Sequence, residues 1–291
     1  MMKTITEAIN ERLARTRNEK QVEVQRTVDA VYRKHSKLRQ IDEAMIDVRT
    51  SRLICSIEGD NEPLPALSKR EEDILKEREQ YLKDNNIRPN FDVPEAECGK
   101  CGDTGFTKAS DGRRIVCTSC MKDALIEVYN ESGMKDFNSY TLKGFDLDRF
   151  KDKGVRRRMF DNLRKLMEGK TDKSLMLLQG GSGTGKTYLA VAACKYAIMQ
   201  GMSAYYIKSD RVAELKADEL DELKTYDLIV IDDYAAEVTS YYKTAMALHT
   251  LLEARQAASK GTVIVSASAL EVLVSDSDER IAGKLKSAGI L

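Results

Sequence analysis

The chain contains 291 residues, with 47 lysines and arginines balanced by 47 aspartates and glutamates, so its formal net charge is zero. This length is enough for about two domains with buried cores. Apolar runs such as residues 228–231 are far shorter than the ~20 residues of a membrane-spanning helix, and the first residues lack the apolar core of a signal peptide. We therefore predict a cytoplasmic protein that does not enter a membrane. The neutral balance also excludes a protein that coats nucleic acid through overall positive charge.

Residues 1–92 predict a helical region that binds a partner. Apolar residues recur there at steps of three, four and seven, which places them on one face of a helix. A second helix is expected from Ser68, where Ser68-Lys-Arg-Glu71 reads as a capping box, to about Asp84. These helices should pack on each other, and an apolar stripe this long is also a candidate for docking another protein. The stripe comprises Val24, Val28, Val31, Leu38, Ile41, Met45 and Val48, with His35 interpreted as a packed residue on it.

Residues 93–136 predict a zinc-binding knuckle. Two Cys-x-x-Cys pairs are separated by fifteen residues, a spacing typical of structural zinc sites. In a chain without an export signal, paired thiols favour a metal over disulfides. Four thiolates leave no coordination position for water, so the metal would be structural; an iron–sulfur cluster is the alternative, and disulfides come last. The expected ligands are Cys98, Cys101, Cys117 and Cys120, with Gly99, Gly102 and Gly105 supplying tight turns.

Residues 137–291 predict an α/β domain with a parallel sheet between helices. Short apolar runs alternate here with helical patterns, as expected for strands joined by crossover helices. The predicted strands cover residues 175–179, 204–207, 227–231 and 262–266, and helices are expected up to about 200, after 209 and from about 239 to 258.

A glycine-rich segment after the first of these strands predicts a nucleotide site. Residues 180–187 match the pattern G-x-x-x-x-G-K-[ST] and lie between a strand and a helix. The glycines let backbone amides point at phosphate oxygens, and the helix N-terminus adds a positive dipole. We expect Lys186 to reach the β- and γ-phosphates of ATP and Thr187 to offer its hydroxyl to Mg²⁺. The predicted ATP- and ADP-binding residues are Gly180, Gly181, Ser182, Gly183, Thr184, Gly185, Lys186 and Thr187.

Two carboxylates complete the predicted catalytic centre. Asp232 and Asp233 end the apolar run 228–231, which places them at the carboxyl edge of the sheet, where α/β proteins bind ligands. We expect Asp232 to hold Mg²⁺ through water and Asp233 to orient or deprotonate the attacking water. Arg280 is the candidate arginine finger, supplied by a neighbouring subunit, a contribution worth ~10³–10⁵ in rate.

The order of parts resembles the DnaC/DnaI-type replicative helicase loaders. These are AAA+ ATPases, and transposition-helper ATPases share their core. The resemblance covers essentially the whole chain and is specific for residues 175–237, with Leu-Leu-Gln-Gly-Gly-Ser-Gly-Thr-Gly-Lys-Thr-Tyr-Leu-Ala and Ile-Asp-Asp-Tyr-Ala-Ala-Glu. It implies that the N-terminal region grips a hexameric replicative helicase. It also implies that the ATPase domain self-associates and couples the ATP state to single-stranded DNA and ring opening.

The chain departs from that family in several places. Where a Thr-Ser-Asn-like sensor is usual it has Ser266-Ala-Ser268-Ala, so Ser268 is expected to contact the γ-phosphate more weakly. Lys284 stands in place of a second arginine and lacks its bidentate contact. The acidic stretch 209–227 argues against DNA contact there, and residues 151–173, with nine bases and four acids, are the better DNA candidate. The chain ends soon after the fourth strand, so the helical lid is expected to be truncated or absent.

The leading hypothesis is therefore an ATP-dependent helicase loader with weak ATPase activity of its own. A transposition helper, whose partner would be a transposase, is the alternative within the same fold. A P-loop kinase for a small substrate is a different class, and no substrate segment is evident for it near the glycine-rich loop. A nucleotide-gated adaptor that binds ATP without hydrolysing it is the third, and the serines at 266 and 268 keep it open.

Overall fold

The computed structural model describes residues 4–109, 112–141, 158, 161–166, 174–235 and 242–290. The chain forms two compact units, one made of Met1–Arg12 with Cys98–Leu291 and the other of Leu13–Glu97. Helix α1 (Ile5–Lys34) contributes to both. Among the residues that the structure describes, no helix combines the length and apolar character that a bilayer crossing requires.

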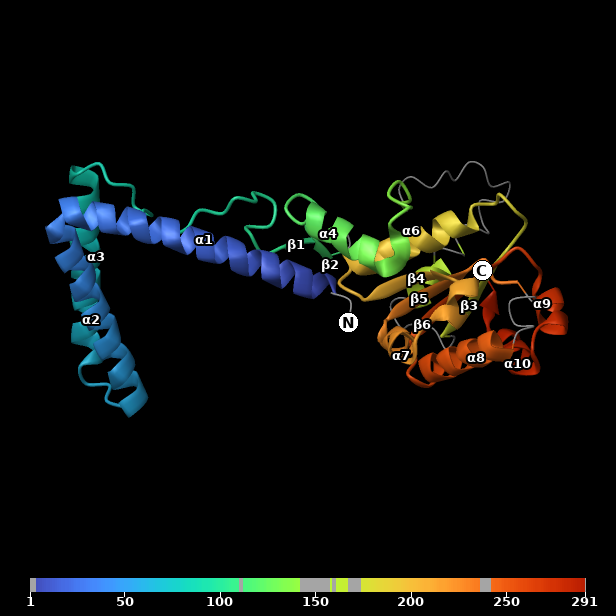
Figure 1. The fold of residues 1–291 in the computed structure, drawn as a ribbon. Coiled ribbons are helices and arrows are strands. Elements are labelled where there is room, and N and C mark those ends of the chain that lie inside the picture. The colour runs from blue at the N-terminus through green and yellow to red at the C-terminus, as the bar shows by residue number, and fades with distance from the viewer. Residues whose placement is uncertain are drawn as a thin grey trace. The chain divides into compact units, whose positions relative to one another are not determined.

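The Leu13–Glu97 unit contains the rest of α1 and two further helices, α2 (Ser36–Glu58) and α3 (Leu64–Asp84). Helices α2 and α3 lie side by side (Figure 1). The predicted second helix is present but begins four residues earlier than Ser68, with Pro65 in its first turn. The predicted packing between helices is confirmed, and it uses two small apolar clusters: Leu38, Leu82 and Phe91, and Ile41, Met45 and Ile74.

His35 separates α1 from α2. Its Nδ1 lies 3.4 Å from the Tyr81 hydroxyl, and the two rings meet edge to face with centroids 6.0 Å apart. The apolar stripe predicted from Val24 to Val48 therefore spans two helices rather than one. The interpretation of His35 as a packed residue is confirmed.

The larger unit is built on a five-stranded parallel sheet with the order β4-β5-β6-β3-β7. Its strands are β3 (Leu175–Gln179), β4 (Ala204–Lys208), β5 (Leu228–Asp232), β6 (Gly261–Ser266) and β7 (Gly289–Ile290). The four predicted strands are confirmed to within one residue at each end, and the two-residue β7 is an addition. The predicted α/β class with a parallel sheet is confirmed.

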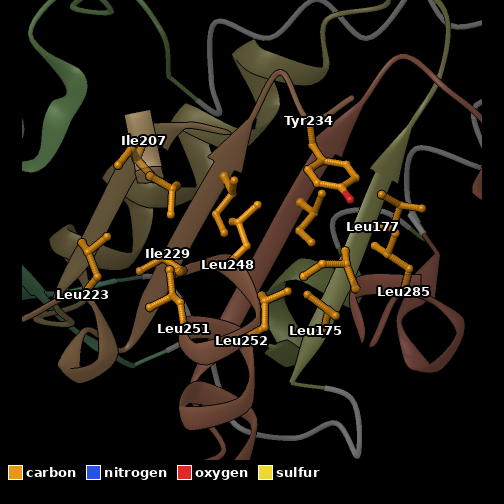
Figure 2. Packing of buried hydrophobic residues seen from close by; sticks show 14 of the residues in the cluster. Leu175, Leu177, Ile207, Leu223, Ile229, Tyr234, Leu248, Leu251, Leu252 and Leu285 are labelled. Atoms are coloured by element: carbon orange, nitrogen blue, oxygen red, sulfur yellow. The ribbon is translucent and has the colours of Figure 1, made fainter. Parts of the chain in front are cut away.

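Helices cover both faces of this sheet (Figure 1). Helix α6 (Lys186–Met199) packs on one face, and α7 (Ala217–Thr225), α8 (Tyr242–Ala257) and α10 (Glu279–Ser287) lie on the other, with α9 (Leu270–Asp276) beside α10. A short 3₁₀ segment, Ser209–Glu214, follows β4. The strand interiors are mainly apolar because both faces of the sheet are buried. Polar residues such as Gln179, Lys208 and Asp232 end their strands. Figure 2 shows the face under α8, where alternate residues such as Leu175, Leu177 and Ile229 meet Leu248, Leu251 and Leu252.

The segment between Cys98 and the sheet forms a small hairpin and a helix. Strands β1 (Phe106–Lys108) and β2 (Arg114–Val116) pair antiparallel, followed by α4 (Lys122–Tyr129) and a wide turn, Asn130–Met134. Gly133 in this turn has φ 78°, and a Cβ there would lie 2.1 Å from the carbonyl oxygen of Tyr206. Only glycine fits this approach to β4.

Arg255 on α8 is fully buried at the N-terminal edge of the sheet, although its type is rarely found there. Its guanidinium donates to Thr262 Oγ1 at 3.0 Å, to the carbonyl oxygens of Leu223 and Tyr226 at 2.8 and 2.7 Å, and to that of Gly261. Burial lowers the pKa of Arg255 to about 9. The side chain thus ties α8 to the ends of α7 and β6.

Candidate nucleotide site and cysteine cluster

The glycine-rich loop connects β3 to α6 as the motif requires. Gly180, Gly183 and Gly185 have φ of 154°, 76° and 86°, values at which a side chain would be strained. Lys186 begins α6, and its Nζ donates to the carbonyl oxygen of Gly181 at 2.8 Å. The Thr184 hydroxyl donates to the same oxygen at 2.9 Å. The loop therefore curves around the N-terminus of α6, and the Lys186 ammonium group lies against its backbone. This geometry fits an anionic ligand.

Asp232, the last residue of β5, is 1% exposed. Its Oδ1 accepts from the Asp233 amide at 2.8 Å, and its Oδ2 accepts from the Tyr206 hydroxyl at 2.8 Å. Burial, with the neighbouring Asp232 carboxylate, raises the pKa of Tyr206 above its usual range. A buried carboxylate with one donor on each oxygen keeps further lone pairs for a hydrated cation.

Asp233 has a different environment from its neighbour. Its backbone adopts φ 54°, and its side chain is 63% exposed. Oδ2 lies 3.0 Å from the ammonium of Lys208 at the end of β4, and this hydrogen bond raises the pKa of Lys208. The main-chain oxygen of Asp233 accepts from the Ser209 hydroxyl at 2.9 Å. An exposed, charged carboxylate at this edge is suited to bind and deprotonate a water molecule.

The loop and the two acids share one edge of the sheet. Both β3 and β5 pair in parallel with β6, which lies between them, so their carboxyl ends point the same way. With neighbouring strands about 4.8 Å apart, the two strand ends are separated by about 10 Å. Lys186, Thr187, Asp232 and Asp233 are thus gathered around the carboxyl edge, where parallel sheets bind ligands.

The end of β6 between them carries the serines of the predicted sensor. Ser266 pairs with Gln179 of β3, and its hydroxyl donates to the carbonyl oxygen of Tyr234 at 2.6 Å. Its Oγ also accepts from the Ser268 amide at 3.1 Å, so Ser266 shapes this turn. Ser268 follows it, half-buried, before α9. The role of Ser268 at the γ-phosphate stays a prediction.

Arg280 lies exposed on α10, just after its N-terminal cap Asp278. Its guanidinium contacts the Met246 sulfur on α8, and Lys284 one turn later donates to Gln256 Oε1 at 3.0 Å. The structure thus places both cations on the surface of α10, against α8 of the same chain. Action of Arg280 on a neighbouring copy stays a prediction.

The four predicted metal ligands form one cluster. Their sulfur atoms all lie within 4.8 Å of one another, with 3.8 Å between Cys98 and Cys117 and 3.5 Å between Cys101 and Cys120. All four are free thiols. A tetrahedral zinc with ~2.3 Å bonds separates its sulfur ligands by about 3.8 Å, so the cluster fits this metal.

Local backbone geometry supports the cluster. Gly102 and Gly105 have φ of 56° and 75°, as their predicted turn roles require, whereas the φ of Gly99 is not positive. The Cys98 amide donates to Asp103 Oδ1 at 2.8 Å. The amides of Cys101 and Lys100 lower the pKa of the Cys98 thiol, which favours the thiolate that binds metal.

Sequence reasoning missed two groups at the nucleotide edge, Tyr206 and Lys208. They lie two residues apart in β4. Tyr206 donates a hydrogen bond to Asp232, and Lys208 forms an ion pair with Asp233. The sequence hinted at these residues only through a hydroxyl and an ammonium group on an otherwise apolar strand. Their partners became evident only from the strand order, which places β4 beside β5. The DNA candidate 151–173 lies largely outside the described residues; within 161–166, Leu163 and Leu166 are buried.

Comparison with known proteins adds independent information. Residues 130–272 match the family model of the IstB-like ATP binding protein. The chain is 24% identical over 201 residues to the replicative helicase loader DnaC of Buchnera aphidicola subsp. Acyrthosiphon pisum (strain APS), covering 65% of this chain and 79% of that protein.

Two solved structures align with part of this chain. AMPPCP-bound DnaA from Aquifex aeolicus aligns with a TM-score of 0.47 and 19% identity over 53% of this chain, and this chain spans half of the DnaA chain. A crystal structure of the DnaC helicase loader aligns with a TM-score of 0.41 and 22% identity, covering 50% of this chain and 94% of that one.

Proposed function

We propose that the protein loads a hexameric replicative helicase onto single-stranded DNA, driven by ATP. The match of residues 130–272 to the IstB-like ATP binding protein family and the similarity to a DnaC helicase loader support this proposal. One observation carries this proposal: a glycine-rich loop and two acids share one sheet edge in a chain whose helical unit exposes an apolar helix face. We assign partner binding to residues 1–92, zinc binding to 93–136 and ATP hydrolysis to 137–291, in the cytoplasm.

Each residue of the nucleotide site has a proposed role. Backbone amides of the loop bind the phosphates of ATP or ADP, and Lys186 offsets their negative charge. Thr187 and Asp232 would hold Mg²⁺, which neutralises phosphate charge when bound. Asp233 accepts the proton of the attacking water. Arg280 would act on the nucleotide of a neighbouring copy, which is why we expect self-association through the ATPase domain.

The cysteine cluster would hold a structural zinc ion. Its four thiols supply all the ligands of a tetrahedral site, and the hairpin that presents them has strands of only three residues. Such a hairpin gains little stability from its own backbone pairing. We therefore assign the metal a role in folding this segment, with no part in hydrolysis.

The partner surface that we propose is the outer face of α2, defined by Ile46, Leu53 and Ile57. These side chains are 63%, 61% and 76% exposed and repeat at i, i+7 and i+11, so they share one side of the helix. The opposite side of α2 carries Ile41 and Met45, which are buried against α3. Burying a large aliphatic side chain contributes about 1.5–3 kcal/mol, so this face can supply much of the helicase affinity.

Co-purification of the full chain with the cognate replicative helicase tests the proposal, with ATP and ADP compared. We expect wild-type protein to bind the helicase, and the double variant Leu53→Asp/Ile57→Asp to bind at least tenfold more weakly. Lys76→Ala, an exposed polar position on α3, is the control and should bind as wild type. If the double variant, still folded, bound the helicase with unchanged affinity, the docking assignment would be wrong.

A nucleotide-gated adaptor is the second candidate. It is favoured because one of the two serines of the predicted sensor, Ser266, donates its hydroxyl to the main-chain oxygen of Tyr234. Measured ATP turnover that disappears in Lys186→Ala would exclude this candidate. A transposition helper would instead co-purify with a transposase and leave the helicase unbound. DNA contact through residues 151–173 belongs to the leading proposal and predicts retention of single-stranded DNA.

A further inference from the structure

We infer that Tyr206 is a positioning residue that fixes the orientation of the Asp232 carboxylate for a magnesium-bound nucleotide. This inference rests on the proposed function of the site as an ATP site. It starts from the hydrogen bond of 2.8 Å that the Tyr206 hydroxyl donates to Asp232 Oδ2. Both side chains are buried, at 5% and 1% exposure, so water does not replace this donor easily.

The carboxylate has one protein donor on each oxygen. Oδ1 accepts from the amide of Asp233, a contact within the same strand end, and Oδ2 accepts only from Tyr206 among the hydrogen bonds of the described residues. Loss of the Tyr206 hydroxyl would leave Oδ2 buried without that donor, which is unfavourable and favours rotation of the carboxylate. The hydroxyl therefore selects one orientation of Asp232.

Tyr206 is itself held on several sides. It lies in β4 opposite Val230 of β5. Its main-chain oxygen lies against Gly133, where a Cβ would come within 2.1 Å. Its ring meets that of Phe137 edge to face, with centroids 5.0 Å apart. The donor atom is thus placed by the strand and by the segment that precedes the ATPase sheet.

The same segment is attached to the helix of the glycine-rich loop. The ammonium of Lys195, on α6, donates to the carbonyl oxygens of Phe137 and Asn138. Lys195 is 5% exposed. Tyr206 therefore contacts both Asp232, at the end of β5, and Phe137, which is hydrogen-bonded to α6. We therefore expect the position of Asp232 to depend on the packing around α6.

Nucleotide affinity at varied Mg²⁺ concentration tests this inference in the full chain. We expect Tyr206→Phe to bind ADP without Mg²⁺ within twofold of wild type. The Mg²⁺ concentration that gives half of the affinity increase should rise about tenfold. Tyr205→Phe, the adjacent strand residue whose ring packs toward Tyr226, is the matched control and should leave this half-point unchanged.

A second variant keeps the inference testable if Tyr206→Phe does not fold. Phe137→Leu removes the ring beside Tyr206 but keeps the Tyr206 hydroxyl. The Mg²⁺ concentration that gives half of the affinity increase should therefore rise by a smaller factor, about threefold. A half-point within twofold of wild type in the folded variants would overturn the inference and leave Tyr206 a core residue. Wild-type protein that binds no nucleotide would instead overturn the proposed ATP site, and the inference with it.

Discussion

The environments of Asp232 and Asp233 differ although the two residues are adjacent. Asp232 is buried beside a phenol that donates one hydrogen bond, whereas Asp233 is exposed and paired with the ammonium of Lys208. Both partners come from β4, two residues apart. Residues of the edge strand β4 thus give the two acids different environments. Asp232 is suited to hold a hydrated cation, and Asp233 is suited to exchange a proton.

The exposed acid should control turnover more than binding. We expect Asp233→Asn to lower the rate of ATP hydrolysis by about 10²-fold or more, because an amide cannot accept the proton from water. ATP affinity should change less than threefold. Single-turnover hydrolysis and nucleotide titration measure the two effects. Asp210→Asn, in the 3₁₀ segment after β4, is the control, and equal rates for the two variants would contradict the role of Asp233.

Loss of the Arg255 side chain should destabilise the larger unit. Arg255→Met would leave the carbonyl oxygens of Leu223 and Tyr226 buried without their donor, and we expect the free energy of unfolding to fall by about 3 kcal/mol. Urea denaturation measures this change. Lys243→Met, an exposed position on α8, should stay within about 0.5 kcal/mol of wild type; a similarly small effect of Arg255→Met would show that its hydrogen bonds are dispensable.

At the scale of elements, the cysteine hairpin should depend on its metal. We expect purified protein to contain one zinc ion per chain. Removal of the metal by a chelator should abolish amide exchange protection in β1 and β2, because the hairpin has too little apolar surface to fold alone. Hydrogen exchange followed by mass spectrometry measures this. Cys98→Ser should reproduce the loss and Cys55→Ser, on α2, should not; protection that survives metal removal would exclude the structural role.

The strands of the sheet were predictable because each is a short apolar run with both faces buried. The run 175–179 coincides with β3, and the other three predicted strands shift by at most one residue. Strand β7 escaped prediction because two residues carry no periodicity. The break at His35 escaped because apolar spacing continues across it, with Val31 and Leu38 in the same cluster on either side.

The nucleotide site was predictable where local sequence carries the chemistry. The loop at residues 180–187 needs its glycines in contiguous order, and the acid pair needs an apolar strand before it. The partners Tyr206 and Lys208 were not predictable, because the order of strands in the sheet is a tertiary property. Arg255 was hidden for the same reason, since its carbonyl acceptors come from two separate segments, the end of α7 and the start of β6.

At the scale of the whole molecule, the first turns of α1 belong with the ATPase unit. Ile5 and Ile9 are 1% and 0% exposed in the unit that contains Cys98–Leu291, whereas the rest of α1 belongs to Leu13–Glu97. A truncation that removes the helical region from residue 1 would therefore uncover apolar surface on the ATPase unit. Point variants on the outer face of α2 avoid this effect.

Calorimetric titration of the full chain with ATP, in the presence and absence of Mg²⁺, tests the central claim most directly. We predict binding that Mg²⁺ strengthens, a loss of at least tenfold in Lys186→Ala, and loss of only the magnesium-dependent part in Asp232→Asn. No binding heat from wild-type protein, or equal affinity in wild type and Lys186→Ala, would contradict the assignment of this sheet edge as an ATP site.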